Sequence, residues 1–158
     1  MSSWVSHLPD EITYRRVIGH GMNSIELEKN DRLDAHWVQD LNKNQILPLE
    51  DASIDACLMV AAWQYLQYPE KVACELKRVV KKGGQLIVSF SNRAFWTKAP
   101  RIWTEGSDFD HLNYVKDVLI AQGWPEAQFI SEPTQKAGFF SFLELNGDPF
   151  FSVLVNNN

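Results

Sequence analysis

The residues best suited to bind a ligand follow the ends of four predicted strands. Gly19 and Gly21 follow the first of these strands, and Asp40, which offers a carboxylate, follows the second. Parallel strands present their carboxyl ends at one edge of a sheet, where the ligands of open α/β folds bind. The strand-end segments are 19–23, 39–41, 61–64 and 89–93. We therefore expect these segments to meet and to form a site for a small molecule.

Two alternating patterns indicate the elements that position these segments. Short apolar runs, typical of strands covered on both faces, alternate with amphipathic stretches that predict helices. The expected strands cover residues 16–18, 36–39, 54–61, 86–90, 128–131 and 150–155, with a further strand over 139–145 before an Asn146-Gly147 turn. Helices are expected after an Asn23 cap completed by Glu26, from Pro69 to Gly83-Gly84, and from Asp108 or Asp110 to Gly123. This order predicts one α/β domain, 1–158, built as a three-layer sandwich with a mostly parallel sheet and a C-terminal antiparallel strand.

Composition narrows the class of protein and of partner. The 158 residues are 45% hydrophobic and 22% charged, which is typical of one globular domain. A net charge of -5 and a pI near 5.3 argue against a nucleic-acid partner. The longest apolar stretch, 56–62, is too short to cross a membrane. Two cysteines and four histidines show no metal-ligand spacing, so we expect no metal site and reduced thiols in a cytoplasmic protein.

Two stretches at a characteristic distance resemble the class I S-adenosylmethionine-dependent methyltransferases, specifically the small-molecule group known as type 11. The segment LPLEDASIDA, residues 47–56, is similar to the family's LPFEDASFDAV. The segment ELKRVVKKGGQLIVSFSNR, residues 75–93, is similar to the family's EVARVLRPGGxLIVSF. The resemblance covers residues 16–155. It implies a Rossmann-like fold, S-adenosylmethionine as cofactor and a small molecule as methyl acceptor.

The resemblance also implies roles for the strand-end residues. In the family, the acidic residue after the third strand approaches the adenine amino group, and Asp40 holds that position; an Asx turn is the alternative interpretation. Asn23 can equally be a helix cap. The implied cofactor-binding residues are Gly19, Gly21, Met22, Asn23, Asp40, Leu41, Ala61 and Trp63. The residues placed to orient an acceptor are Gln64, Ser91 and Asn92. No catalytic residue is implied, because the sulfonium of the cofactor already activates the methyl group.

The sequence departs from the family pattern at two places. The family ends its second strand with Asp or Glu, which binds the ribose hydroxyls, whereas Gly21 stands there in this chain. The glycine-rich loop after the first strand has no counterpart, because Met1 to Pro9 resembles the segment that follows it. We expect a chain truncated before its first strand, or a true start upstream of Met1. Two functions stay open: a methyltransferase, and a non-catalytic interaction or oligomerisation module.

A missing first strand would leave unpaired backbone groups in the centre of the sheet. Each buried unpaired group costs about 1–3 kcal/mol, so some compensation is expected. The strands on either side of the gap would pair directly, Ser2–Leu8 would fold into the gap, or a second copy in a homodimer would supply the missing chain.

Overall fold

A computed structural model gives the structure of residues 1, 3, 6–132 and 149–158. Helices alternate with strands, as the sequence predicts. The elements are β1 (Ile18–Gly21), α1 (Ser24–Glu28), β2 (Ala35–Val38), β3 (Ile54–Val60), the 3₁₀ turn η1 (Trp63–Tyr65), α2 (Pro69–Val79), β4 (Val80–Phe90), α3 (Arg101–Glu105), α4 (Asp108–Ala121), β5 (Gln128–Glu132) and β6 (Phe150–Asn156). The strand expected over 139–145 and its turn lie outside the described residues.

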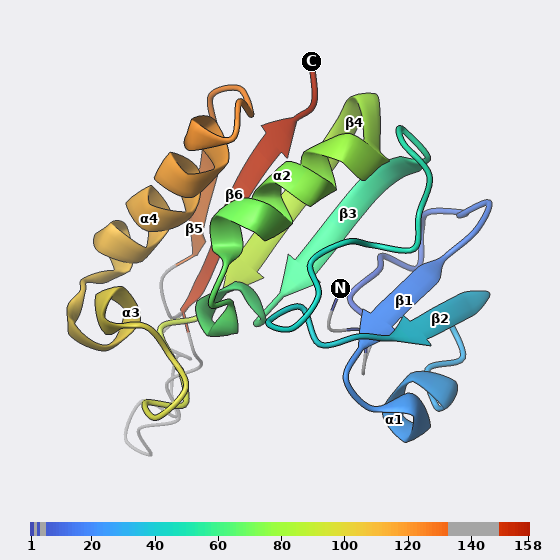
Figure 1. The fold of residues 1–158 in the computed structure, drawn as a ribbon, viewed down its shortest axis with the longest axis horizontal. Helices are drawn as coiled ribbons and strands as arrows, with labels where there is room; N and C mark the ends of the chain where they lie inside the picture. The colour runs from blue at the N-terminus through green and yellow to red at the C-terminus, as the bar shows by residue number, and fades with distance from the viewer. Residues whose placement is uncertain (2, 4–5, 133–148) are drawn as a thin grey trace, which may run out of the picture.

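The described strands form two sheets. β1 pairs with β2 in parallel, and the second sheet has the order β3-β4-β6-β5 (Figure 1). β3 and β4 are parallel neighbours, as predicted, and β6 runs antiparallel to both β4 and β5. This is a Rossmann-like α/β fold with a C-terminal antiparallel strand. β3 is nevertheless the outer strand of its sheet, and its Ala56 is exposed although Met59 is fully buried. The prediction of a strand covered on both faces is therefore wrong for β3, because the described helices α2 and α4 cover one face of its sheet and Ala56 stays exposed.

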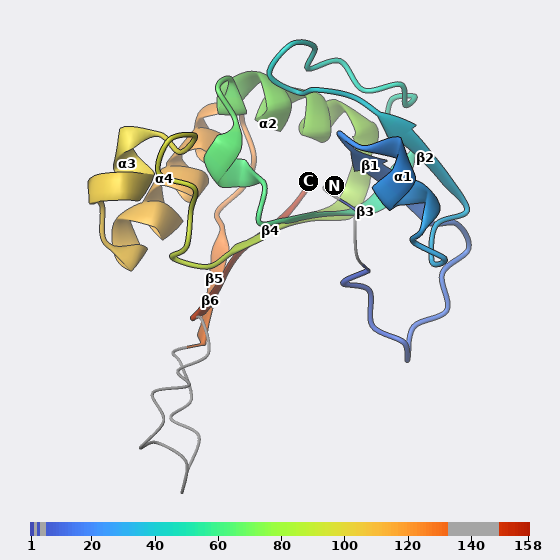
Figure 2. The same ribbon diagram turned by 90° about the horizontal axis from the view of Figure 1, so that it is seen from below.

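The core lies between the four-stranded sheet and two helices. α2 packs on β4, α4 packs on β6, and the two helices contact each other on the same face of the sheet (Figure 2). Alternate side chains of the strands fill this layer, and Leu86, Val88 and Val153 are fully buried. The smaller sheet has its own contact with α1, in which Leu27 is buried.

Several element ends differ from the prediction for local reasons. β1 begins at Ile18, and both of its glycines lie inside the strand because it pairs with β2 as far as Gly21. α2 passes directly into β4 at Val80, and Gly83, with a φ of 76°, turns the chain within the start of β4 instead of ending the helix.

The cap of α4 is Ser107 and not Asp108 or Asp110. The Ser107 hydroxyl accepts a hydrogen bond from the Asp110 N–H, and the Asp110 carboxylate accepts one from the Ser107 N–H at 2.8 Å. This reciprocal pair is a capping box, in which the acidic residue belongs three positions after the cap. At α1, Asn23 caps the helix alone and the expected contribution of Glu26 is not part of the cap.

Arg78 holds the loop before β3 against α2. Its guanidinium donates to the carboxylates of Glu75 and Asp51, each at 2.5 Å, and to the Leu47 carbonyl at 3.3 Å. The Glu75 carboxylate also accepts from the Leu47 N–H at 2.7 Å. The hydrogen bond from Arg78 is the main cause that holds the pKa of Glu75 below its ordinary value. The entry into β3 is thus fixed by one ionic cluster.

We expect Arg78→Met to lower the free energy of unfolding by about 1–2 kcal/mol. Hydrogen bonds to charged groups contribute about 1.5–3 kcal/mol, and solvent screening at the partly exposed guanidinium reduces that value. Lys71→Met, which removes an exposed cation from the same helix, is the matched control. Urea denaturation measures both variants. Equal losses in the two would mean that the cluster does not stabilise the fold.

β1 and β3 lie on either side of a short N-terminal segment, and we call the space between the two strands the slot. Met1 and Ser3 lie in it: the Met1 amino nitrogen donates to the Leu58 carbonyl, and the Ser3 N–H donates to the His20 carbonyl at 2.8 Å. The two strands do not pair directly in the described structure. Of the three expected compensations, insertion of the N-terminal segment is therefore confirmed for Ser3, together with Met1, and direct pairing is wrong. The homodimer stays a prediction.

His20 is buried beside the slot, with 6% of its surface exposed. Its Nε2–H donates to the Gln39 carbonyl, with 2.9 Å between the two atoms, whereas Nδ1 has no partner among the described residues. Burial lowers the pKa of His20 to about 4. A cavity of about 70 Å³ adjoins the ring and is lined mainly by apolar side chains. A cavity of that volume costs about 2 kcal/mol relative to a filled core.

We expect the free energy of unfolding to fall as the pH decreases from 6.5 to about 4. In the unfolded chain His20 gains its proton near pH 6.5, whereas in the folded protein it does so only near pH 4. The folded state therefore binds fewer protons in this window, and the stability present above pH 6.5 is lost as the pH falls. The full difference corresponds to about 3 kcal/mol.

Urea unfolding at a series of pH values checks this expectation, and His20→Gln should flatten the slope. His111→Gln is the matched variant, because burial also lowers the pKa of His111. Identical slopes in the wild type and in His20→Gln would remove His20 as the cause.

Candidate functional site

Hydrogen bonds between loops tie the carboxyl ends of four strands into one edge. The Gln39 N–H, after β2, donates to the Gly21 carbonyl at the end of β1, at 3.1 Å. The Asn42 side-chain amide then donates to the Tyr65 carbonyl, after β3, at 3.0 Å. The Tyr65 hydroxyl accepts from the Phe95 N–H, after β4, at 3.2 Å. The predicted strand-end segments therefore meet at one edge of the molecule.

Two of these linking residues, Asn42 and Phe95, were not singled out from the sequence as site residues. Each follows a strand end by several residues, and neither has a motif of its own. The available signal was their position, because polar and aromatic residues just beyond parallel strands tend to line ligand sites.

The two predicted glycines of β1 have packing roles. A Cβ at Gly19 would lie 2.3 Å from Leu33 Cδ1, and a Cβ at Gly21 would lie 3.2 Å from Leu27 Cδ2. Both positions let neighbouring leucines pack directly on the strand. Gly21 ends β1 and presents no side chain to a ligand.

Met22 and Asn23 follow β1 at the surface. Met22 is 70% exposed. The Asn23 Oδ1 accepts from the Ile25 N–H at 3.0 Å and so caps α1. The helix-cap interpretation of Asn23 is confirmed, and any contact with a ligand would come in addition to it.

Asp40 forms a turn and keeps an accessible carboxylate. Its Oδ1 accepts from the Asn42 N–H at 3.0 Å, which is an Asx turn. Its Oδ2 lies 3.5 Å from Lys43 Nζ, and 25% of the Asp40 side chain is exposed. The neighbouring Leu41 side chain is buried in the core. The Asx-turn interpretation is confirmed, and the geometry leaves Asp40 accessible to a ligand.

The segment after β3 is strained at one residue and buried at the next ones. Ala61 has a φ of 49°, a left-handed conformation that residues with a side chain rarely adopt, and its N–H donates to the Ser89 carbonyl at 2.8 Å. Trp63 and Gln64 are 1% and 2% exposed, so the Trp63 ring is part of the core. The Gln64 Oε1 accepts no hydrogen bond from a described residue. Gln64 is therefore a buried acceptor that needs a donor.

The segment after β4 is more open. Ser91 is half-buried and its hydroxyl accepts from the Arg93 N–H at 3.2 Å, whereas Asn92 is exposed. Phe95 and Trp96 follow with 70% and 73% of their surface exposed. The residues predicted to orient an acceptor thus lie at the same edge as the cofactor residues, with aromatic surface beside them.

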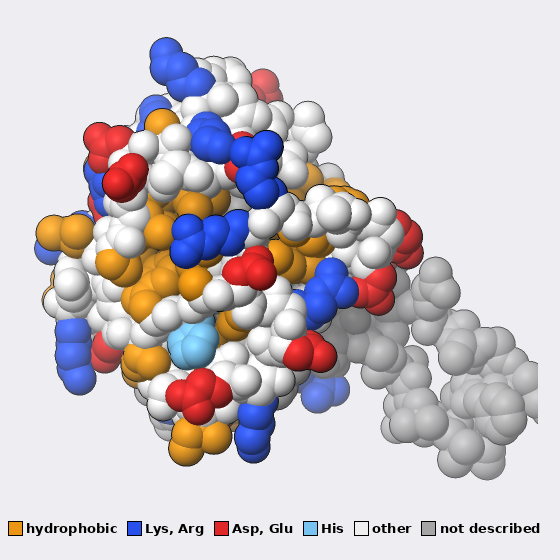
Figure 3. All heavy atoms as spheres, turned by 90° about the vertical axis from the view of Figure 1, so that its right-hand side faces the viewer, with side chains coloured by type: hydrophobic (Ala, Val, Ile, Leu, Met, Phe, Trp, Pro, Cys, Tyr) orange, Lys and Arg blue, Asp and Glu red, His pale blue; other side chains and the backbone are white. Residues whose placement is uncertain are grey.

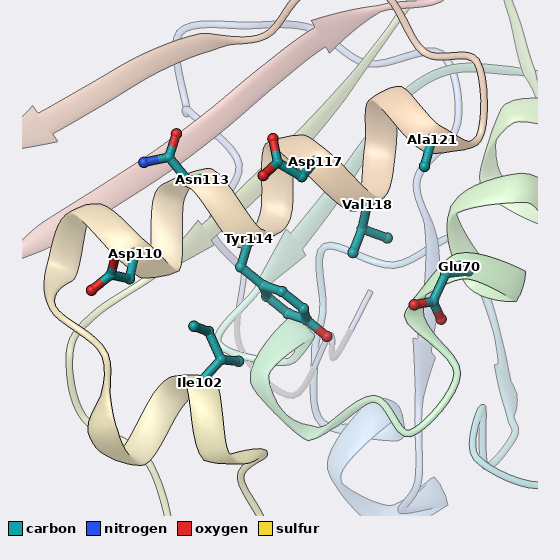
Figure 4. A pocket seen from close by; sticks show the side chains of 8 residues that line it. All are labelled: Glu70, Ile102, Asp110, Asn113, Tyr114, Asp117, Val118 and Ala121. Carbon is teal, nitrogen blue, oxygen red and sulfur yellow. The ribbon is translucent and has the colours of Figure 1, made fainter.

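Two hollows in the described structure lie away from this edge. The larger, of about 430 Å³, is a groove between α4, α3 and the start of α2 (Figure 4). Carboxylates of Glu70, Asp110 and Asp117 line it together with Tyr114, whose pKa is raised by burial. The smaller hollow is the cavity beside the slot. Neither is lined by a predicted cofactor residue, so the candidate site rests on the geometry of the strand ends.

The side of the molecule that carries β2 has exposed apolar surface. Hydrophobic side chains gather there between charged ones (Figure 3). Val38, in the outer strand β2, is 51% exposed, and Ile46 in the following loop is 70% exposed. Exposed apolar patches of this kind mark interaction surfaces.

The described residues offer neither a membrane span nor a metal cluster. None of the described helices has the length and apolar character that a membrane span requires. Within the same residues, no three His, Cys, Asp or Glu side chains are arranged to hold a metal ion. Cys57 and Cys74 are free thiols.

The chain matches one protein family in part of its sequence, and its fold is similar to that of solved structures. Residues 16–88 match the family described as a methyltransferase domain. No curated protein sequence matches the chain. Its fold is similar to an S-adenosylmethionine-dependent methyltransferase from Thermotoga maritima, described as a possible histamine N-methyltransferase, with a TM-score of 0.63 and 19% identity over 90% of this chain and 73% of that one.

Two further solved structures show the same likeness. A protein from Haloferax volcanii, named as a methyltransferase and seen in complex with the Trm112 methyltransferase activator, has a TM-score of 0.63 and 17% identity over 90% of this chain and 72% of that one. A methyltransferase from Aquifex aeolicus has a TM-score of 0.58 and 19% identity over 89% of this chain and 68% of that one. The match over residues 16–88 and the shared fold are consistent with a class I S-adenosylmethionine-dependent methyltransferase.

Proposed function

We propose that the chain binds S-adenosylmethionine at the carboxyl edge of β1 to β4 and transfers the methyl group to a small molecule. The observation that carries this proposal is the series of hydrogen bonds through Gly21, Asn42, Tyr65 and Phe95, because it holds four strand-end loops as one surface. The family match includes the ends of β1, β2 and β3. The description of the T. maritima protein as a possible histamine N-methyltransferase supports a small acceptor.

The residues at this edge fit the adenine of the cofactor better than its ribose. The Asp40 carboxylate is partly exposed and can accept a hydrogen bond from the adenine amino group. The exposed residues Met22 and Ala61 lie at the neighbouring strand ends. Gly21 provides no carboxylate for the ribose. The loss of such a charged pair lowers affinity by about 1.5–3 kcal/mol, or about 10- to 100-fold. We therefore propose weaker binding than in a family member that has this carboxylate.

The chemistry leaves the protein with the task of orientation. S-adenosylmethionine supplies a methyl group that is already activated, so binding and alignment of the acceptor are sufficient. Gln64, with its unpartnered Oε1, is the best candidate to accept a hydrogen bond from a hydroxyl or amine of the acceptor. Ser91 and Asn92 lie after the next strand and would contact the acceptor from its other side.

A non-catalytic interaction module is the second candidate. Two observations favour it: Gly21 leaves the ribose without a carboxylate, and Val38 and Ile46 expose apolar surface beside the site. The H. volcanii protein is seen with a protein partner, which supports a partner here. The homodimer that we expected from the sequence would instead supply chain between β1 and β3.

We expect Asp40→Asn to weaken the binding of S-adenosylhomocysteine by about 10-fold or more. The asparagine oxygen can still accept from the Asn42 N–H and keep the turn, whereas the charge that receives the adenine amino group is lost. Isothermal titration calorimetry measures the dissociation constant, and the thermal midpoint checks that the turn is intact.

Asp31→Ala is the matched control, because it removes the same charge from an exposed turn before β2. An unchanged dissociation constant in Asp40→Asn would remove Asp40 from the site. The absence of any measurable binding in the wild-type protein would favour the non-catalytic module.

A further inference from the structure

The side chain of Asn42 joins two of the strand-end loops. Its Nδ2 donates to the Tyr65 carbonyl at 3.0 Å, and its Oδ1 accepts from the Gln67 N–H at 2.8 Å. Among the described residues, these are the hydrogen bonds that connect segment 39–46 with segment 61–68. The side-chain amide of Asn42 therefore pairs with the loop after β3 through one donor and one acceptor, as a peptide group of a neighbouring chain would.

The backbone of Asn42 is held at the same time by Asp40. The Asn42 N–H donates to the Asp40 Oδ1 at 3.0 Å. The N–H groups of Lys43 and Asn44 both donate to the Asp40 carbonyl, each at 3.0 Å. These bonds close a turn that begins at the Asp40 carboxylate and includes the Asn42 backbone. A displacement of Asp40 would therefore move the side-chain amide of Asn42 with it.

The loop on the other side of Asn42 carries Gln64, the best candidate to bind the acceptor. Tyr65 follows Gln64 directly within η1. The Tyr65 hydroxyl accepts from the Phe95 N–H at 3.2 Å, so the loop after β4 is joined to the same residue. Figure 1 shows the chain after β2 passing beside η1, where the bond from Asn42 to Tyr65 lies. One side chain thus connects the turn that holds Asp40 to the loop that holds Gln64.

Asn157 makes a comparable bridge that is only structural. Its Nδ2 donates to the Lys77 carbonyl at 3.2 Å and to the Val80 carbonyl at 2.7 Å, and Asn157 is 6% exposed. It joins α2 to the start of β4, away from the candidate site. Asn42, in contrast, is half-buried, and Gln67 is exposed. A half-buried bridge between two loops can open locally while the core stays folded.

We propose that Asn42 is a positioning residue that couples the two halves of the candidate site, so that cofactor bound at Asp40 orders the loop that carries Gln64; this rests on the proposed function, which assigns the adenine amino group to Asp40. A ligand that fixes the Asp40 carboxylate also fixes the turn, and Asn42 transmits this order to the loop after β3. The acceptor then meets a loop that is already ordered, so each ligand favours the binding of the other. We expect the acceptor to bind more tightly after the cofactor than before it.

Amide hydrogen exchange on the full chain without ligand tests the coupling itself. Asp40→Ala removes the acceptor of the Asn42 N–H, whereas Asp40→Asn retains one. We expect Asp40→Ala to speed exchange at the Gln67 amide by about 5-fold or more, and Asp40→Asn to stay within about 2-fold of the wild type. In an Asn42→Ala background, Asp40→Ala should add no further acceleration. An unchanged Gln67 rate in Asp40→Ala alone would overturn the proposal, and this comparison does not require any Asn42 variant to fold.

Exchange in the presence of S-adenosylhomocysteine, at the same fractional saturation of each variant, tests the transmission. We expect the ligand to slow exchange at the Gln67 amide by about 5-fold or more in the wild type and in Asn157→Ala, the matched control, but by less than about 2-fold in Asn42→Ala. Loss of binding in Asn42→Ala alone would also support the proposal, whereas equal slowing in Asn42→Ala and Asn157→Ala would overturn it. If calorimetry shows no binding to the wild type, the proposed function fails, and the ligand-free exchange rates still decide whether Asn42 couples the loops.

Discussion

Backbone hydrogen bonds from Met1 to β3 and from Ser3 to β1 connect the two sheets beside the candidate site. A strand that is paired along one edge leaves the N–H and C=O of every second residue, those on its other edge, in need of partners. Both strands have this need at the same place, and Met1 and Ser3 meet part of it. Through these two bonds the same N-terminal segment contacts both sheets.

The residues with the clearest family resemblance are structural. Within the segment 47–56, Leu47 and Asp51 bond to the Glu75–Arg78 pair of α2, and the Ala52 N–H donates to the Arg78 carbonyl at 2.9 Å. This cluster determines how the chain enters β3. The resemblance therefore reports on the scaffold that directs β3 toward the site, and it carries no information on the methyl acceptor. The difference explains why the fold can be assigned while the acceptor has to be proposed.

Local patterns predicted the strands and α2, and long-range contacts decided the rest. The run 86–90 is a nearly continuous apolar stretch of strand length, which the sequence displays directly. The division into two sheets depends on which edges find partners, and no local pattern encodes that. Trp63 illustrates the same limit in the site: a position after a strand suggested a ligand contact, but η1 turns the ring into the core. The bond from Asn42 to Tyr65 joins residues 23 apart in the chain, so only the folded structure brings them together.

Asn23 and Asp40, the two polar residues predicted to bind the cofactor, already make local hydrogen bonds. Only their remaining donor and acceptor atoms are therefore available to a ligand. The Asn23 Oδ1 is used as the cap of α1, which leaves its amide as a donor. Asp40 uses one oxygen for its turn, but a carboxylate has about four acceptor positions and can serve a turn and a ligand together. At the end of β1, a Cβ at Gly21 would lie 3.2 Å from Leu27 Cδ2, so a side chain there would require the leucine to shift by a few tenths of an ångström. Gly21 itself offers no carboxylate to a ribose. Recognition at this edge has to rely on Asp40 and on backbone groups.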